Sequence, residues 1–163
     1  MTKKILAYID HFQGKAQQSS WEGLGLAAAI AGDSGGEAAA LILGDGVGEL
    51  TEAAFHFGAD QVFLADDPVL KDFRPEPLAD MVKKAAETYQ PDLILFPTTT
   101  RGRTLAGMAA VDLDTGVMVD VIGSRLVRRP SCRHQAHLCW QAVGKISLQH
   151  NSPDHHPQDP GFR

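Results

Sequence analysis

The sequence predicts an α/β protein, a three-layer parallel sheet of about five strands with helices on both faces. Three features predict this class. Five short apolar runs recur along the chain, the stretches between them have helical character, and most of the runs are almost continuously apolar. Strands that are buried on both faces of a parallel sheet have this composition. The repeated order of strand and helix implies right-handed crossovers between parallel strands.

The expected elements follow the chain in a simple alternation. Strands are expected at residues 4–9, 37–43, 61–65, 93–96 and 117–121. Helices are expected at residues 21–31, 45–57 and 75–89, and in the Ala-rich stretch that ends at residue 111. Ser19 or Ser20 is placed to cap the first helix, and Thr100 or Thr104 the last.

Size and composition narrow the class of protein further. At 163 residues and 44% hydrophobic content, the chain is large enough for one domain with its own core. No apolar run approaches the length of a membrane span, and the run near the start ends at Asp10, which favours a strand over a signal peptide. Because residues 1–131 contain no cysteine, we expect a cytoplasmic protein. The net charge of −5 argues against nucleic-acid binding.

The composition changes class near residue 127. Residues 1–126 carry 18 acidic and 10 basic side chains, whereas residues 127–163 carry 2 acidic and 5 basic ones. The second segment also holds five of the seven histidines and four of the nine prolines. We therefore expect an α/β domain over residues 1–126 and an atypical tail over residues 127–163.

Ligands of parallel sheets bind at the carboxyl ends of the strands. The loop of residues 98–103, Thr-Thr-Thr-Arg-Gly-Arg, offers hydroxyls, helix N–H groups and two guanidinium groups to an anion. Thr100, Arg101 and Arg103 are therefore candidate cofactor-binding residues. The alternative is a structural or interface role, in which replacing either arginine changes stability little.

Other candidate sites have plainer explanations. The glycines at 44, 46 and 48 do not form the full dinucleotide-binding pattern and suit a strand-to-helix turn. Asp66 and Asp67 read as an acidic turn, His11 and His56 lack ligand partners at metal spacing, and no catalytic set stands out. In the tail, two cysteines and three histidines form only a crude metal-like cluster, Cys132, Cys139, His150, His155 and His156.

Residues 3 to about 124 resemble a known family. The matching pieces lie in the same order and spacing, and they are residues 5–9, 41–47, 57–68, 91–96, 102–106 and 115–121. They resemble the N-terminal domain of the alpha subunit of electron transfer flavoprotein. The resemblance implies an adenine-nucleotide-hydrolase-like (Rossmann-like) domain, a heterodimer with a beta subunit, and FAD as the cofactor of that complex.

The resemblance fails after about residue 125. Read one base out of frame, however, the codons of residues 138–142 permit Tyr-Ala-Gly-Lys, a motif that the family carries at this place. From residue 153 the same shift permits a sequence close to the family's next motif. We therefore predict a frameshift between about residues 122 and 137. An out-of-frame tail is not expected to complete the sheet, since its few scattered apolar residues cannot offset the ordering of the chain.

The resemblance implies that this domain is a scaffold, and because no catalytic set stands out we expect no catalyst. The resemblance implies a heterodimer that passes electrons from flavin dehydrogenases, commonly acyl-CoA dehydrogenases of fatty acid oxidation, through FAD. In the family a second domain provides most of the FAD site; we expect it to be absent here and this chain alone to bind no cofactor tightly. The alternative is a stand-alone small-nucleotide-binding or stress-sensor protein, but the Gly-x-x-Gly loop of such proteins is missing.

Overall fold

The computed structural model describes residues 3–122 and 139–144, and the side chains of residues 3–118. The strands are β1 (Lys4–Ile9), β2 (His11–Phe12), β3 (Lys15–Ala16), β4 (Glu37–Gly44), β5 (Gln61–Asp66), β6 (Leu93–Pro97), β7 (Gly116–Ile122) and β8 (Cys139–Gly144). The helices are α1 (Gln18–Ser34), α2 (Leu50–His56), α3 (Pro75–Tyr89) and α4 (Thr100–Asp112), with a short 3₁₀ turn at Pro68–Leu70.

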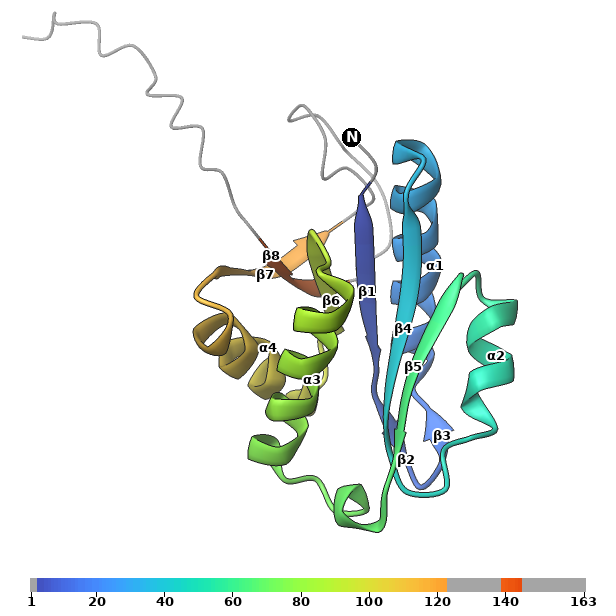
Figure 1. Cartoon of the computed structure of the whole chain (residues 1–163), viewed down its shortest axis with the longest axis vertical. Helices are drawn as coiled ribbons and strands as arrows, with labels where there is room; N and C mark the ends of the chain where they lie inside the picture. Colours follow the sequence, from blue (N-terminus) through green and yellow to red (C-terminus); the bar gives the residue numbers. More distant parts are fainter. Residues whose placement is uncertain (1–2, 123–138, 145–163) are drawn as a thin grey trace, which may run out of the picture.

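One six-stranded sheet organises the described chain (Figure 1). Its order is β5-β4-β1-β6-β8-β7, and the first four strands are parallel neighbours. The register places Ile5 opposite Ala38 on one side of β1 and opposite Leu93 on the other. The predicted α/β class is therefore confirmed.

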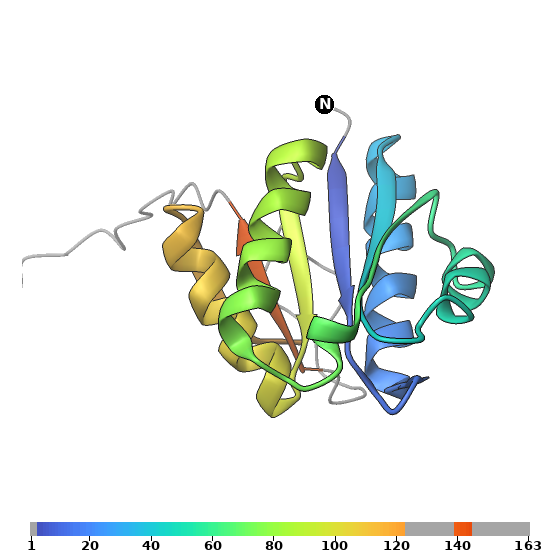
Figure 2. The ribbon, with the colours of Figure 1, turned by 60° about the horizontal axis from the view of Figure 1, so that its bottom comes forward.

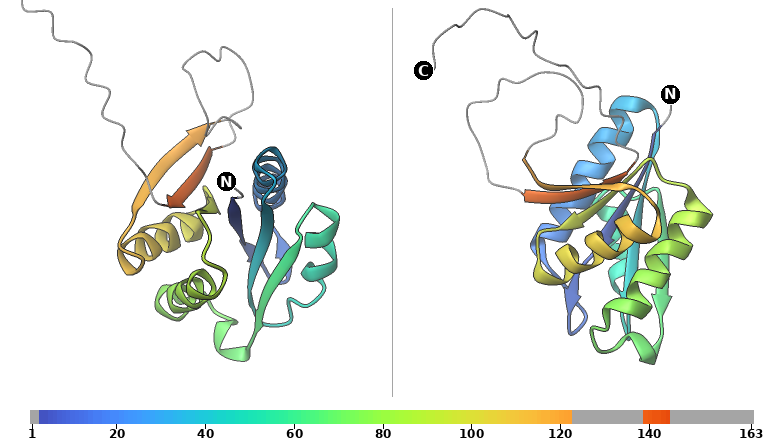
Figure 3. Two further views of the ribbon diagram at one scale, coloured as in Figure 1. Left: turned by 45° about the horizontal axis from the view of Figure 1, so that its top comes forward. Right: turned by 90° about the vertical axis from the view of Figure 1, so that its left-hand side faces the viewer.

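The far end of the sheet differs from the prediction in two ways. The fifth expected strand, β7, does not adjoin β6, because β8 lies between them and runs antiparallel to both. Figure 3 shows β7 and β8 side by side next to α4. The expectation that residues 127–163 add no strand is thus wrong for Cys139–Gly144. Strand pairing uses main-chain groups, and the run Cys-Trp-Gln-Ala-Val contains no proline and includes residues that favour strands.

The strand β8 counts against the predicted frameshift at these residues, since an out-of-frame segment was not expected to complete the sheet. Several other expectations for the tail lie outside the described residues. They concern Cys132, His150, His155 and His156.

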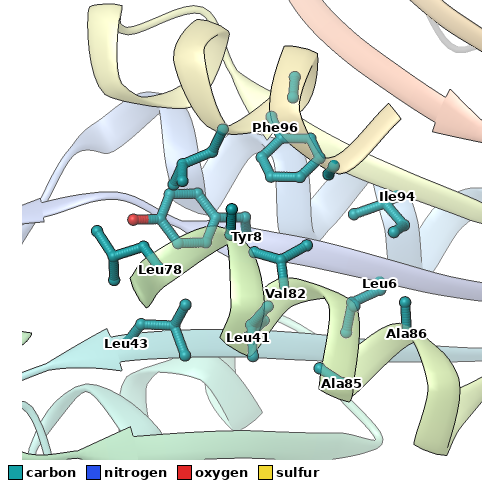
Figure 4. Close-up of a cluster of buried hydrophobic side chains, with 14 of the residues drawn as sticks. Leu6, Tyr8, Leu41, Leu43, Leu78, Val82, Ala85, Ala86, Ile94 and Phe96 are labelled. Carbon is teal, nitrogen blue, oxygen red and sulfur yellow. The ribbon is translucent and has the colours of Figure 1, made fainter. Parts of the chain in front are cut away.

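Helices cover both faces of the sheet, which makes the three expected layers (Figure 2). Alternate residues of β1 point to opposite faces. Ile5, Ala7 and Ile9 pack with α1 and α2, whereas Leu6 and Tyr8 pack with α3 and α4. The core under α3 joins Tyr8, Leu41, Val82 and Phe96, with the Tyr8 and Phe96 rings 5.7 Å apart (Figure 4).

Two helices differ in length from their expected ranges. α1 begins at Gln18, before the expected residue 21, and Ser20 lies buried inside it instead of capping it. α2 begins only at Leu50, because residues 45–48 form a turn in which Gly46 has a φ of 67°. Sequence patterns locate helix ends poorly where a glycine-rich turn precedes the first apolar residue.

A small hairpin after β1 was not expected. Its strands, β2 and β3, are joined by Gln13 and Gly14, which both have positive φ, 50° and 74°. Two successive residues with positive φ form the turn that best suits a two-residue hairpin. The hairpin thus lies at the carboxyl end of β1, where the expected ligand edge begins.

Within the described residues, no helix combines the length and the apolar character that crossing a bilayer requires.

Candidate functional site at the carboxyl edge of the sheet

The sheet changes its winding direction at β1. From β1 the chain moves to β4 and β5 on one side and then crosses back to β6 on the other. The loops after β1 and β6 therefore leave the sheet toward opposite faces, which opens a crevice at their carboxyl ends. Asp10 and His11 follow β1 there, and the Thr-rich turn follows β6.

A cavity of about 320 Å³ occupies this switch point. Its walls come from the end of β1, the hairpin and the N-terminal ends of α1 and α4, through Asp10, His11, Phe12, Gln17, Thr99, Thr100 and Arg101. Two of the three predicted site residues, Thr100 and Arg101, line it. The third, Arg103, is exposed on α4 and does not.

Asp10 is the buried charged residue of this cavity, with only 4% of its surface exposed. Its main-chain groups are satisfied: the N–H donates to Ser20 Oγ (2.9 Å), and the carbonyl accepts from Gln17 N–H (2.9 Å) and Ser20 Oγ (3.1 Å). The carboxylate oxygen Oδ1, in contrast, is buried with no hydrogen-bond partner among the described residues. Sequence reasoning placed Asp10 at this edge but assigned it no role.

Arg101 fastens the hairpin to α4. Its guanidinium donates a 3.0 Å hydrogen bond to the His11 carbonyl and lies 5.6 Å from the ring centre of Phe12 and 5.2 Å from that of Phe73. The expectation that its replacement changes stability little assumed an exposed side chain, but Arg101 is half-buried between two rings. Those contacts support a structural role, and Arg101 also lines the cavity.

The charged residues of the cavity, Asp10 and Arg101, influence the pKa of Tyr8 in the core. Burial raises the pKa of the Tyr8 hydroxyl, and the Asp10 carboxylate raises it further, whereas the Arg101 guanidinium opposes them. Both charges of the cavity thus act on a residue in the centre of the sheet.

The start of α4 depends on close packing against β6. Thr99 caps the helix by accepting a 3.0 Å hydrogen bond from Gly102 N–H, so the predicted caps Thr100 and Thr104 are wrong. Thr104 instead donates to the Thr100 carbonyl. A Cβ on Gly102 would collide with the Pro97 carbonyl, and only glycine allows this approach.

The neighbouring loop after β4 is closed by the protein itself. Asp66 accepts hydrogen bonds from Gly46 N–H (2.7 Å) and Val47 N–H (3.3 Å). Gly44 lies against the His11 ring, whose Nε2 donates to the Leu43 carbonyl at 2.8 Å. These contacts support the interpretation of the glycines as a strand-to-helix turn.

The other candidates also have structural contacts. Asp67 accepts from Val69 N–H (2.8 Å) and caps the 3₁₀ turn, while His56 is exposed at the end of α2. In the part of the chain that the structure describes, no three His, Cys, Asp or Glu side chains gather as a metal site would require.

Comparison with known proteins identifies the class. Residues 5–129 match the family described as "Electron transfer flavoprotein domain". The chain therefore belongs to the electron transfer flavoprotein family.

Its relatives are of the alpha-subunit type. Protein FixB of Azorhizobium caulinodans is 32% identical over 139 residues, which cover 79% of this chain and 38% of that protein. The electron transfer flavoprotein subunit alpha of Thermoanaerobacterium thermosaccharolyticum is 33% identical over 121 residues, or 74% of this chain and 37% of the subunit.

A third relative is subunit LctC of the lactate dehydrogenase (NAD(+),ferredoxin) of Acetobacterium woodii. It is 34% identical over 116 residues, which are 71% of this chain and 28% of LctC. The resemblance to alpha subunits is thus confirmed, and the aligned part of this chain spans less than two fifths of the length of these three relatives.

Proposed function

We propose that this chain is the N-terminal scaffold domain of an electron transfer flavoprotein alpha subunit. The observation that carries the proposal is the family match over residues 5–129 together with the alpha-subunit names of its relatives. In the intact heterodimer, FAD accepts electrons from flavin dehydrogenases such as acyl-CoA dehydrogenases and passes them on. The domain supports this carrier and is itself no catalyst.

The partner of the domain is the beta subunit of the same flavoprotein, and the complex acts in the cytoplasm. The relatives named above are not stand-alone nucleotide sensors, so they give the alternative function no support. FAD belongs to the complex. We expect little of its binding energy from residues 1–126, because the two described cavities at this edge of the sheet have volumes of only about 320 and 470 Å³, whereas FAD is a large dinucleotide.

The flavin content of the purified chain tests the cofactor part of this proposal. We expect the 163-residue chain to purify colourless and to remain so after incubation with FAD and removal of the excess. The positive control is a full-length alpha subunit co-expressed with the beta subunit. This heterodimer should show the flavin absorbance bands. A stoichiometric flavin on this chain alone would contradict the proposal.

The nucleotide sequence of the gene tests the proposed domain boundary at residue 126. We propose that the reading frame changes between about residues 122 and 137. The end of the family match at residue 129 supports this view, and the strand β8 opposes it. Resequencing the gene decides between them. A restored frame that encodes a flavin-binding domain supports the frameshift, and a confirmed original frame refutes it.

A further inference from the structure

We infer that the larger cavity at the carboxyl edge binds a small zwitterion, a molecule that carries an ammonium, a carboxylate and an apolar group. The volume of this cavity is about 470 Å³, which lies within the range of about 300–1,000 Å³ that is usual for small-molecule sites. The inference goes beyond the scaffold role, and it rests on charges of both signs that line one cavity.

Three loops and one helix build the walls of the cavity. The β2–β3 hairpin, the loop after β4 and the segment before α3 gather at the carboxyl ends of the strands, and the start of α4 completes the wall (Figure 1). Gly46 N–H donates to Asp66, and Arg101 donates to the His11 carbonyl. The tip of the hairpin meets the next loop, since a Cβ on Gly14 would lie 4.0 Å from the Gly46 carbonyl oxygen. Contacts within the chain therefore hold the walls in place without a ligand.

Two cations and two carboxylates line the cavity, so their formal charges sum to zero. They are Lys71 and Arg101, and Asp45 and Asp72. The side chains of Asp45, Lys71 and Asp72 make no hydrogen bond or ion pair with the residues that the structure describes. Arg101 donates to the His11 carbonyl through Nη1, whereas a guanidinium carries five N–H groups. These charged groups are therefore available to a ligand.

The charges come from different sides of the cavity. Arg101 belongs to α4, which follows β6, whereas Asp45 follows β4, and these two strands lie on opposite sides of β1. Lys71 and Asp72 come from the segment after β5. The carboxylate of a zwitterion can bind the cations while its ammonium binds Asp45. A simple anion would be repelled by the two carboxylates, and a simple cation by Lys71 and Arg101.

Two aromatic rings give the cavity an apolar surface. Phe12 is 55% exposed, and Phe73 is half-buried. Their ring centres lie 5.6 and 5.2 Å from the guanidinium carbon of Arg101. An apolar group that contacts either ring therefore lies close to the cation that binds the carboxylate. An apolar amino acid has this arrangement, and so does a short peptide whose last residue is apolar.

Calorimetric titration of the complete chain tests the inference. We expect the dipeptide alanyl-phenylalanine to bind with a dissociation constant below about 1 mM. Its N-acetyl and C-terminal amide forms each lose one ionic contact and should bind about three- to tenfold more weakly. Equal binding of the blocked and unblocked forms would overturn the inference, and so would the absence of binding.

Free phenylalanine separates the two sources of this chemistry. If it binds as tightly as the dipeptide, the ligand is an amino acid. If it binds more weakly, the ligand is a short peptide that fills more of the cavity. Failure of both compounds to bind would refute the site and leave the scaffold role untouched.

Two conservative variants test the charged groups one at a time. Asp45→Asn and Lys71→Met remove one charge each at nearly constant size, and each should weaken dipeptide binding about three- to tenfold. The matched controls are Asp80→Asn and Lys84→Met, which change exposed residues of α3 outside the cavity and should bind like the unmodified chain. If the variants bind like their controls, the charges do not contact the ligand.

Charge reversal tests the sign of the interaction. Asp45→Lys raises the formal charge of the lining from zero to plus two. We expect this variant to bind the anionic N-acetyl dipeptide about three- to tenfold more tightly than the unmodified chain does, and the cationic dipeptide amide more weakly. Because Asp45 is exposed, the melting temperature should change little. An unchanged order of preference among the three forms would overturn the inference.

Discussion

Two aspartates at the carboxyl edge of this sheet have opposite surroundings. Asp66, at the end of β5, is exposed, and its carboxylate accepts hydrogen bonds from Gly46 and Val47. Asp10, after β1, is buried, and its Oδ1 has no partner in the described part of the chain. The comparison teaches that the hydrogen bonds of a carboxylate do not follow from its burial: the exposed Asp66 closes a loop, whereas Oδ1 of the buried Asp10 makes no hydrogen bond to the described residues.

The largest expected effect concerns the start of α4, where it packs against β6. Gly102→Ala places a Cβ against the Pro97 carbonyl and must push the start of α4 away from β6. We expect a loss of about 2–3 kcal/mol in the free energy of unfolding, measured by urea denaturation.

Gly107→Ala is the control on the same helix. Nothing lies within 4 Å of a Cβ at Gly107, so this variant should gain about 0.5–1 kcal/mol through helix propensity. Equal effects of the two substitutions would show that α4 does not depend on its contact with Pro97.

The next effect concerns the loop that Asp66 closes. Asp66→Ala removes the acceptor of two main-chain N–H groups, and we expect a loss of about 1–2 kcal/mol in unfolding free energy. Asp72→Ala, in an exposed position of the neighbouring loop, should change it by less than about 0.5 kcal/mol. If Asp66→Ala and Asp72→Ala unfold alike, the contrast between the two aspartates disappears.

The next prediction compares Arg101, which holds the hairpin, with the exposed Arg103. Arg101→Ala removes the hydrogen bond to the His11 carbonyl and the contacts with Phe12 and Phe73, at a cost of about 1–2 kcal/mol. Hydrogen exchange of the hairpin amides should rise together with this loss. Arg103→Ala, from an exposed position, should leave hairpin exchange unchanged. Unchanged exchange in Arg101→Ala would refute the fastening role.

The smallest expected effect on stability concerns Tyr89, which lies far from the carboxyl edge, and it appears only at alkaline pH. Burial raises the pKa of Tyr89 from 10.0 to about 12, and the Glu37 and Asp60 carboxylates add to the rise. Because the folded protein holds this proton more tightly, the associated stability is complete below pH 10 and is lost as the pH rises through about 12. Denaturation midpoints should fall over that range, and less steeply in Tyr89→Phe. A flat profile would contradict the assignment.

The strands and most of the helices could be predicted because they depend on local composition. The runs at β1, β4 and β6 are apolar and almost wholly buried, the apolar run at β5 forms a partly exposed edge strand, and α3 shows its period directly. Only some residues of the candidate site could be predicted from the sequence. Thr100 and Arg101 stood out by residue type, whereas Phe12, Gln17 and Phe73 carry no chemical signal and reach the site only through the fold.

By itself, the sequence determined the α/β class, the family, and the edge of the sheet at which polar loops gather, because each depends on residue types and spacing along the chain. Only the tertiary structure decided that β8 separates β6 from β7, that Thr99 caps α4, and that Arg101 is held between two aromatic rings. Strand pairing and side-chain burial depend on which segments meet in space, and no local pattern records whether a carboxylate such as Asp10 finds a hydrogen-bond donor there.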